Sequence, residues 1–243
     1  MSHKPKAAER LIVALDVDTA EKAMEIVQDL NGLVSFFKVG YQLFITEGLA
    51  LVRQLIEGNK RVFLDLKMDD VEETIRRAVA NIAATGVEFL TIHGSGATVR
   101  AAREGRGGRK EPKLLSVTLL SSLDANDLKD LFASSKLTVE SYVKWRAKQA
   151  LDSGCEGLIA SGETIGMLHK LYPSAIIVAP GIRPADSSRD EHKRALSPGD
   201  AIRAGADYLV VGRPLRNASN PRNAAEKIIE EMEQAFQELG FRQ

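Results

Sequence analysis

The stretch Arg61–Asp70 reads RVFLDLKMDD, an apolar run that ends in alternating acidic and basic side chains. Its Val62–Leu66 portion is typical of a strand buried on both faces of a parallel sheet. Similar apolar runs recur at fairly even intervals along the chain: Leu11–Leu15, Val34–Val39, Val87–Ile92, Leu114–Leu120, Gly157–Ala160, Ala175–Ala179 and Tyr208–Val211. We therefore predict eight buried strands.

The segments between these runs have helical periodicity. Thr19–Leu30 carries apolar residues on one helical face, and Ala224–Phe236 closes the chain in the same way. Eight strands alternating with eight helices predict an α/β fold, a single (β/α)8 TIM barrel with its active site at the C-terminal strand ends. An open, doubly wound sheet is the alternative, although it usually has fewer strands at this length. We expect one domain over residues 1–243, with residues 1–9 as a flexible N-terminal tail.

Composition narrows the class of protein. Lys plus Arg equal Asp plus Glu at 33 each, which argues against a protein that binds nucleic acid or a membrane surface. Any anion must then be bound by a local cluster. The single cysteine, Cys155, excludes a disulfide framework, and the polar Met1–Arg10 does not resemble a signal peptide. The single cysteine is typical of a reducing compartment, so we expect a cytoplasmic protein. No run approaches the roughly 18 apolar residues of a membrane span.

Two segments are longer than ordinary connections. Ser121–Leu137 follows the fifth predicted strand and Gly181–Pro198 follows the seventh, which places both loops on the catalytic face of a barrel. Gly105–Arg109, by contrast, precedes the fifth strand and therefore belongs to the opposite face. We interpret it as a solvated turn rather than a phosphate loop.

Charged residues stand at the ends of three consecutive predicted strands. Asp16 follows the first and Lys38 ends the second. Asp65 and Lys67 end the third strand, two residues apart and so on the same side of it. Because neighbouring strands lie about 4.8 Å apart, these groups are expected to share one patch, with Asp70 in the next loop.

A salt-bridge network that closes the barrel is the alternative explanation for this charged patch. Such a network is a poor source of stability, because the cost of desolvation can exceed the Coulombic gain. Four charged positions on three consecutive strands, on the face where barrel enzymes keep their sites, favour catalysis.

Other polar residues near the strand ends have ordinary structural explanations. His93 ends the fourth strand, and we assign it no catalytic role. Asp70 with Glu73 could cap the following helix, a role compatible with catalysis. Cys155 is interpreted as a buried core thiol.

The seventh and eighth strands are each followed by glycine and arginine. The sequences are Pro180–Arg183, PGIR, and Val211–Pro214, VGRP. The loops after the seventh and eighth strands form the usual phosphate site of such barrels. Glycine lets the backbone approach an anion closely, and the planar guanidinium of arginine can donate two hydrogen bonds to phosphate oxygens. We therefore predict a phosphate site at Arg183 and Arg213, the alternative being two unrelated turns.

These motifs together resemble the orotidine 5′-monophosphate decarboxylase family in its bacterial form, over nearly the whole chain. The matching stretches are Ala14–Val17, Phe37–Gly40, Asp65–Asp70, Pro180–Arg183 and Val211–Pro214. The resemblance implies a lyase of pyrimidine biosynthesis that forms UMP. It also implies a homodimer with shared active sites.

The resemblance also implies the role of each matching residue. Lys67 would donate a proton to ring carbon 6, and Asp65 would lie near the substrate carboxylate. The remaining catalytic positions would be Lys38 and Asp70, the latter reaching into the neighbouring subunit's site together with Thr74. Binding residues would be Asp16, Lys38 and Thr74 for the ribose, Ser121 for the pyrimidine, and Arg183, Gly212 and Arg213 for the phosphate.

Lys38 distinguishes this family from its metal-dependent relatives. The Asp-x-Lys-x-x-Asp element also resembles magnesium-dependent sugar-phosphate decarboxylases and aldolases, which typically carry a glutamate ligand where Lys38 stands. A lysine would repel Mg²⁺, so we expect neither metal nor cofactor. A non-catalytic nucleotide-phosphate binder is a third alternative, disfavoured by the intact Asp65, Lys67 and Asp70.

The chain departs from the family pattern in two places. Val71-Glu72 follows Asp70, where most bacterial relatives have Ile-Pro. His192 stands where the family usually has a glutamine that bridges phosphate and pyrimidine. Neutral histidine can also donate and accept, so His192 is a candidate for the same contact.

Overall fold

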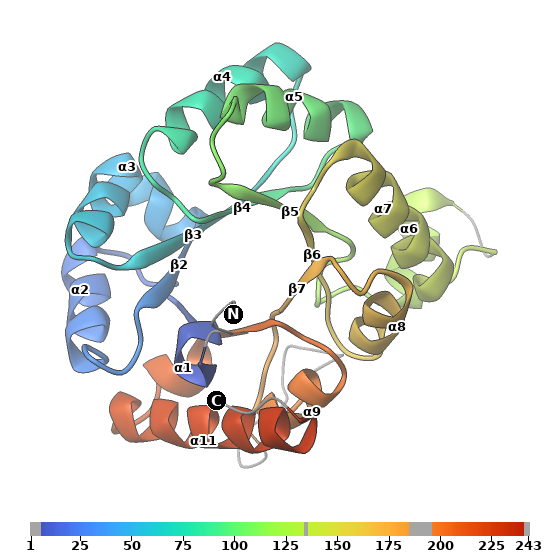
Figure 1. The fold of residues 1–243 in the computed structure, drawn as a ribbon. Helices are drawn as coiled ribbons and strands as arrows, with labels where there is room; N and C mark the ends of the chain where they lie inside the picture. Colours follow the sequence, from blue (N-terminus) through green and yellow to red (C-terminus); the bar gives the residue numbers. More distant parts are fainter. Residues whose placement is uncertain (1–5, 134–135, 185–195, 241–243) are drawn as a thin grey trace.

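The computed structural model describes residues 6–133, 136–184 and 196–240. Within these ranges, eight parallel strands close into one barrel in chain order, with the last strand paired to the first. Figure 1 looks along this barrel. The predicted TIM barrel is thus confirmed, and the open-sheet alternative is wrong. The strands are β1 Leu11–Ala14, β2 Phe36–Gly40, β3 Arg61–Met68, β4 Phe89–Ile92, β5 Lys113–Val117, β6 Gly157–Ile159, β7 Ile176–Ala179 and β8 Tyr208–Val211.

Helices form a ring around the barrel (Figure 1). The two helices predicted by periodicity are present as α2 and α11, and each begins after a side chain that caps it, Thr19 and Asn220 respectively. The helices are α1 Ala7–Arg10, α2 Ala20–Asp29, α3 Tyr41–Glu57, α4 Glu72–Ala83, α5 Gly96–Arg106, α6 Ala125–Phe132, α7 Val139–Ser153, α8 Thr164–Leu171, α9 Pro198–Arg203, α10 Arg213–Arg216 and α11 Pro221–Glu238.

The alternation of side chains along each strand divides the core into two parts. In β1, Leu11 and Val13 belong to the larger cluster packed with the helices, whereas Ile12 and Ala14 belong to the barrel interior. All four are buried. Strand positions on both faces are therefore mostly apolar, which is why the strands read as apolar runs.

Aromatic rings fill the interior of the barrel. Phe36, Phe89 and Tyr208 pack edge to face, with ring centroids 5.1–6.0 Å apart. The Arg61 guanidinium lies 4.1 Å from the centre of the Phe36 ring and binds both carboxylate oxygens of Glu88. These rings and the Arg61–Glu88 pair fill the barrel near the start of the strands, because Phe36, Arg61 and Tyr208 are the first residues of β2, β3 and β8.

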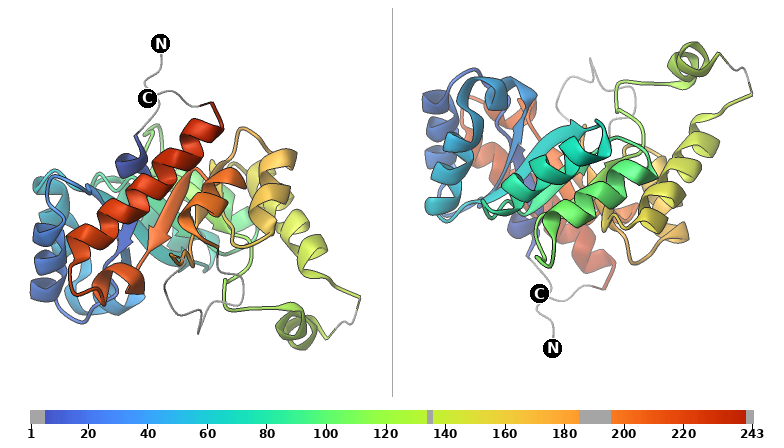
Figure 2. Two further views of the ribbon diagram at one scale, coloured as in Figure 1. Left: turned by 90° about the horizontal axis from the view of Figure 1, so that it is seen from below. Right: turned by 90° about the horizontal axis from the view of Figure 1, so that it is seen from above.

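Two sequence predictions about connecting segments need correction. The tail predicted over residues 1–9 is wrong for its last residues, because Ala7–Arg10 is a helix and Ala7 is buried. The loop predicted over Ser121–Leu137 contains α6, which Asp124 caps through the backbone N–H groups of Asn126 and Asp127. Figure 2 shows α6 at the opposite end of the barrel from α1. Residues 185–195, most of the other predicted loop, lie outside the described residues.

The predicted solvated turn over Gly105–Arg109 is wrong for Gly105 and Arg106. Both are buried residues of α5, and only the following Gly107 and Gly108 form the turn. A methyl group on Gly105 would collide with the backbone carbonyl of Arg76 in α4. Gly105 is thus required for the close approach of two helices.

A matched pair of substitutions tests this packing. Gly105→Ala is expected to lower the free energy of unfolding by about 1–3 kcal/mol, because the backbone of α4 must move. Gly108→Ala is the control, since a methyl group there meets no atom within 4 Å. Urea denaturation of both variants measures the difference, and equal stability would contradict the packing role.

Among the described residues, no helix has the length and apolar character needed to cross a lipid bilayer.

Candidate active site

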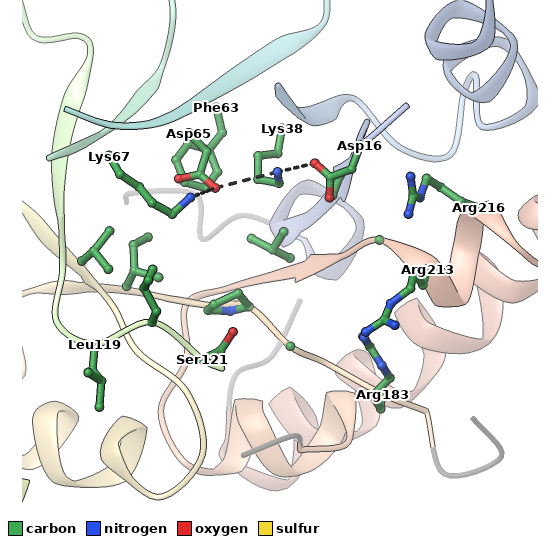
Figure 3. A pocket seen from close by; sticks show the side chains of 18 residues that line it. Asp16, Lys38, Phe63, Asp65, Lys67, Leu119, Ser121, Arg183, Arg213 and Arg216 are labelled. Atoms are coloured by element: carbon green, nitrogen blue, oxygen red, sulfur yellow. Dashed lines mark hydrogen bonds and ion pairs between the residues drawn. The ribbon is translucent and has the colours of Figure 1, made fainter. Parts of the chain in front are cut away.

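A cavity of about 360 Å³ opens at the C-terminal ends of the strands (Figure 3). Most of the residues predicted to form a site line this cavity: Asp16, Lys38, Asp65, Lys67, Ser121, Arg183, Gly212 and Arg213. They come from the ends of β1, β2 and β3 and from the segments that follow β5, β7 and β8. The barrel therefore brings together residues that are almost 200 positions apart in sequence.

Acidic and basic groups alternate across one wall of the cavity. The Lys38 Nζ lies 2.7 Å from Asp16 Oδ1 and 3.8 Å from Asp65 Oδ2. The Lys67 Nζ lies 2.9 Å from the same Asp65 oxygen. Asp65 thus holds two ammonium groups, and its side chain is only 15% exposed. The salt-bridge alternative is right that these groups pair, but the pairs face an open cavity rather than a sealed core.

This charge array is already balanced by the protein's own cations. The Lys38 ammonium stands between the carboxylates of Asp16 and Asp65. In the described part of the chain, no group of three or more His, Cys, Asp or Glu side chains is placed to hold a metal ion.

Lys67 adopts an unusual backbone conformation. Its φ angle is +44°, in the left-handed region, which costs a residue with a Cβ about 1–2 kcal/mol. The register between β3 and β4 shifts between Leu64 and Met68, so the regular ladder is interrupted where Asp65 and Lys67 lie. Strain of this kind persists only where the surroundings fix it, and it is frequent at functional sites.

Three arginines lie at the far side of the cavity from Lys67 (Figure 3). Arg183 is 8% exposed and follows Gly181, whose φ of +76° suits glycine. Arg213 begins α10. Arg216 was missed by sequence reasoning, although its position one helical turn after Arg213 was a usable signal. The Nε of Arg216 is buried and has no hydrogen-bond partner in the described part of the chain.

Apolar side chains form the floor of the cavity. Phe63, Val117, Ile159 and Val210 line it and also belong to the barrel interior. Sequence reasoning missed them as site residues because they resemble every other buried strand residue. They lower the local dielectric beside the charged groups, which strengthens the electrostatic interactions there.

Three predicted site residues are not in the cavity wall. Asp70 and Thr74 are exposed, and neither lines the cavity of its own chain. His192 lies outside the described residues. The capping interpretation is wrong, because α4 starts after Val71 without a side-chain cap and Glu73 binds Arg76 and Arg77 instead.

Two other polar residues lie outside the cavity lining, as expected. Burial lowers the pKa of His93 below its usual 6.5, with a smaller contribution from the positive charge of Arg146. Cys155 is buried, and burial raises its pKa to about 12, so its thiol is not a nucleophile at neutral pH.

Comparison with known proteins places this geometry in a family. Residues 9–228 match the family described as "Orotidine 5'-phosphate decarboxylase / HUMPS family". The chain belongs to this family. The orotidine 5'-phosphate decarboxylase of Nitrobacter winogradskyi is 46% identical over 231 residues, which are 95% of this chain and 95% of that protein. The enzyme of the same name from Rhodopseudomonas palustris strain HaA2 is 45% identical, over 95% of this chain and 97% of that protein.

Solved structures agree with the family assignment. The crystal structure of orotidine 5'-phosphate decarboxylase from Lactobacillus acidophilus superposes with a TM-score of 0.80 and is 33% identical, covering 92% of this chain and 99% of that one. The resemblance of the motifs to the orotidine 5'-phosphate decarboxylase family is thus confirmed along almost the whole chain. The family fold is the closed barrel described above.

Proposed function

We propose that the chain converts orotidine 5′-monophosphate into UMP and carbon dioxide in pyrimidine biosynthesis, without a metal or cofactor. One observation supports this proposal most strongly. The ammonium groups of Lys38 and Lys67 both pair with the Asp65 carboxylate at one side of the cavity, and three arginines lie at the other side. The cavity therefore offers cations to both ends of a substrate that carries a carboxylate and a phosphate. We place the reaction in the cytoplasm, in keeping with the single cysteine.

The reaction breaks the bond between ring carbon 6 and the carboxylate carbon. Carbon dioxide leaves, and the bonding electron pair stays on carbon 6. The Lys67 ammonium stabilises this charge because it is already fixed beside Asp65 before the reaction begins. It then transfers a proton to carbon 6, and the neutral amine takes a new proton from water after UMP departs.

The other residues bind and orient the substrate. Asp16 and Lys38, which are bonded to each other, would contact the ribose, and Ser121 the pyrimidine edge. Arg183, Gly212 and Arg213 would hold the phosphate. Binding energy from the phosphate, far from carbon 6, helps to order the site for the chemical step. His192 remains a candidate for a contact between phosphate and pyrimidine.

We further propose that two chains share their active sites in a homodimer. Asp70 and Thr74 are exposed, so they are available to a second copy of the chain. Two large apolar side chains at the same end of the barrel are also exposed: Val71 is 69% exposed and Tyr41 is 52% exposed. The Tyr41 hydroxyl donates a hydrogen bond to the Leu66 carbonyl. Burial of such side chains against a second copy favours association.

Turnover in the presence of a chelator tests the proposed reaction. The purified protein is expected to deplete orotidine 5′-monophosphate, followed by its absorbance, and to release one carbon dioxide per UMP. Excess EDTA should leave the rate unchanged, because Lys38 and Lys67 supply the positive charge. Absence of turnover, or turnover only with added Mg²⁺, would overturn the proposal, the second result in favour of the metal-dependent sugar-phosphate enzymes.

A further inference from the structure

A buried hydroxyl on β4 connects the two central residues of the site. Thr91 is fully buried and does not line the cavity. Its Oγ1 donates to Asp65 Oδ1 at 2.8 Å and accepts the backbone N–H of Lys67 at 2.9 Å. The direction of both bonds is fixed, because a backbone N–H can only donate and an ionised carboxylate can only accept.

The register of the sheet explains why a side chain is needed at this point. Leu64 pairs with Leu90, and Met68 pairs with Ile92. Three residues of β3, Asp65 to Lys67, therefore stand opposite the single residue Thr91. The hydrogen bonds of the regular ladder are interrupted at this bulge, and a buried backbone N–H without an acceptor costs free energy. The Thr91 hydroxyl supplies the missing acceptor for Lys67.

The same hydroxyl fixes the orientation of the Asp65 carboxylate. Oδ1 of Asp65 is bonded to Thr91, which leaves Oδ2 facing the ammonium groups of Lys67 and Lys38. Rotation of the carboxylate would break the bond to Thr91. One buried group thus holds both the backbone of Lys67 and the carboxylate that positions its ammonium.

We infer that Thr91 is a positioning residue for the decarboxylation, acting through Asp65 and Lys67 without touching the substrate. The inference rests on the proposed function, because it assigns the geometry that Thr91 maintains to proton transfer at carbon 6. Loss of the hydroxyl should let the Lys67 ammonium move relative to carbon 6. Displacement by about 1 Å in such a site reduces turnover on the order of 100-fold.

Two substitutions separate the hydroxyl from the shape of the side chain. Thr91→Val keeps the shape and removes the hydroxyl, whereas Thr91→Ser keeps the hydroxyl and removes the methyl group. Thr164→Val is the matched control: Thr164 is also buried, and its hydroxyl donates to the backbone carbonyl of Ser161, but it does not line the cavity. The measurements are kcat and KM for orotidine 5′-monophosphate, the Kd of UMP, and Tm.

Thr91→Val is expected to lower kcat about 100-fold, while the Kd of UMP changes by less than about threefold, because the phosphate contacts remain. Thr91→Ser should recover most of the lost kcat, and Thr164→Val should retain it. The inference is overturned by a normal kcat in Thr91→Val, by a Thr91→Ser variant as slow as Thr91→Val, or by equal losses in kcat and UMP affinity. If the unsubstituted protein does not turn over the substrate, the proposed function itself fails, a result distinct from these three.

Discussion

Lys67→Ala is expected to lower kcat for orotidine 5′-monophosphate by about 10⁴-fold or more, while binding of UMP stays measurable. The substitution removes the proton donor, an effect worth about 10²–10⁴-fold, and the fixed positive charge beside carbon 6, worth about 10²–10³-fold. Asp65 would also lose the closer of its two ammonium partners, since Lys67 lies 2.9 Å away and Lys38 3.8 Å. The arginines that face the phosphate are unchanged, so the Kd of UMP should change far less than kcat.

Lys60→Ala is the matched control for this experiment. Lys60 directly precedes β3, whose other end carries Lys67, and its ammonium binds Asn31 rather than a cavity residue. Its removal should leave kcat and the Kd of UMP unchanged. Unchanged turnover in Lys67→Ala would remove Lys67 from the proton-transfer step.

A mixture of two inactive variants should regain activity if active sites are shared. Asp70→Ala alone is expected to lose most turnover, because the partner's cavity then lacks its carboxylate. In a heterodimer with Lys67→Ala, one site carries both lesions and the other carries neither. Random exchange between symmetric dimers makes half of them heterodimers, so about a quarter of the normal activity should return.

Lys67→Ala mixed with Asp65→Ala is the control for subunit exchange. Asp65 and Lys67 line the cavity of the same chain, so every site of that heterodimer carries one lesion and no activity should return. The two mixtures are compared by initial rate after exchange has been demonstrated with labelled subunits. No recovery in the Asp70 mixture would contradict a role for Asp70 across the interface.

The barrel was predictable because its strands are buried on both faces. A strand that packs against helices outside and side chains inside the barrel is mostly apolar, and Leu11–Ala14 is apolar at every position. This pattern can be recognised without knowing which residues the strand contacts. The charged strand ends were predictable for the complementary reason. A charge that interrupts such a run is costly unless it is paired, so Lys38 and Asp65 stood out as candidates for a site.

The parts that sequence reasoning missed depend on neighbours from distant segments. Thr91 is an ordinary β-branched strand residue until the register places its hydroxyl against Asp65 and Lys67. Gly105 was interpreted as part of a solvated turn, but it lies in α5 where that helix packs against α4. Residue type alone does not encode either contact, because each is made only when two separate elements meet.

The sequence by itself determined that the chain forms a parallel barrel whose strand ends carry acids, lysines and arginines. Only the tertiary structure decided how Asp65 and Lys67 come to lie together. They were expected to share a side of a regular strand, but a shifted register and a left-handed Lys67 place them instead. The physical reason is that the pairing of β3 with β4, and not the spacing within β3, determines the position of the bulge. The same pairing places the Thr91 hydroxyl where it can bond to Asp65 and Lys67.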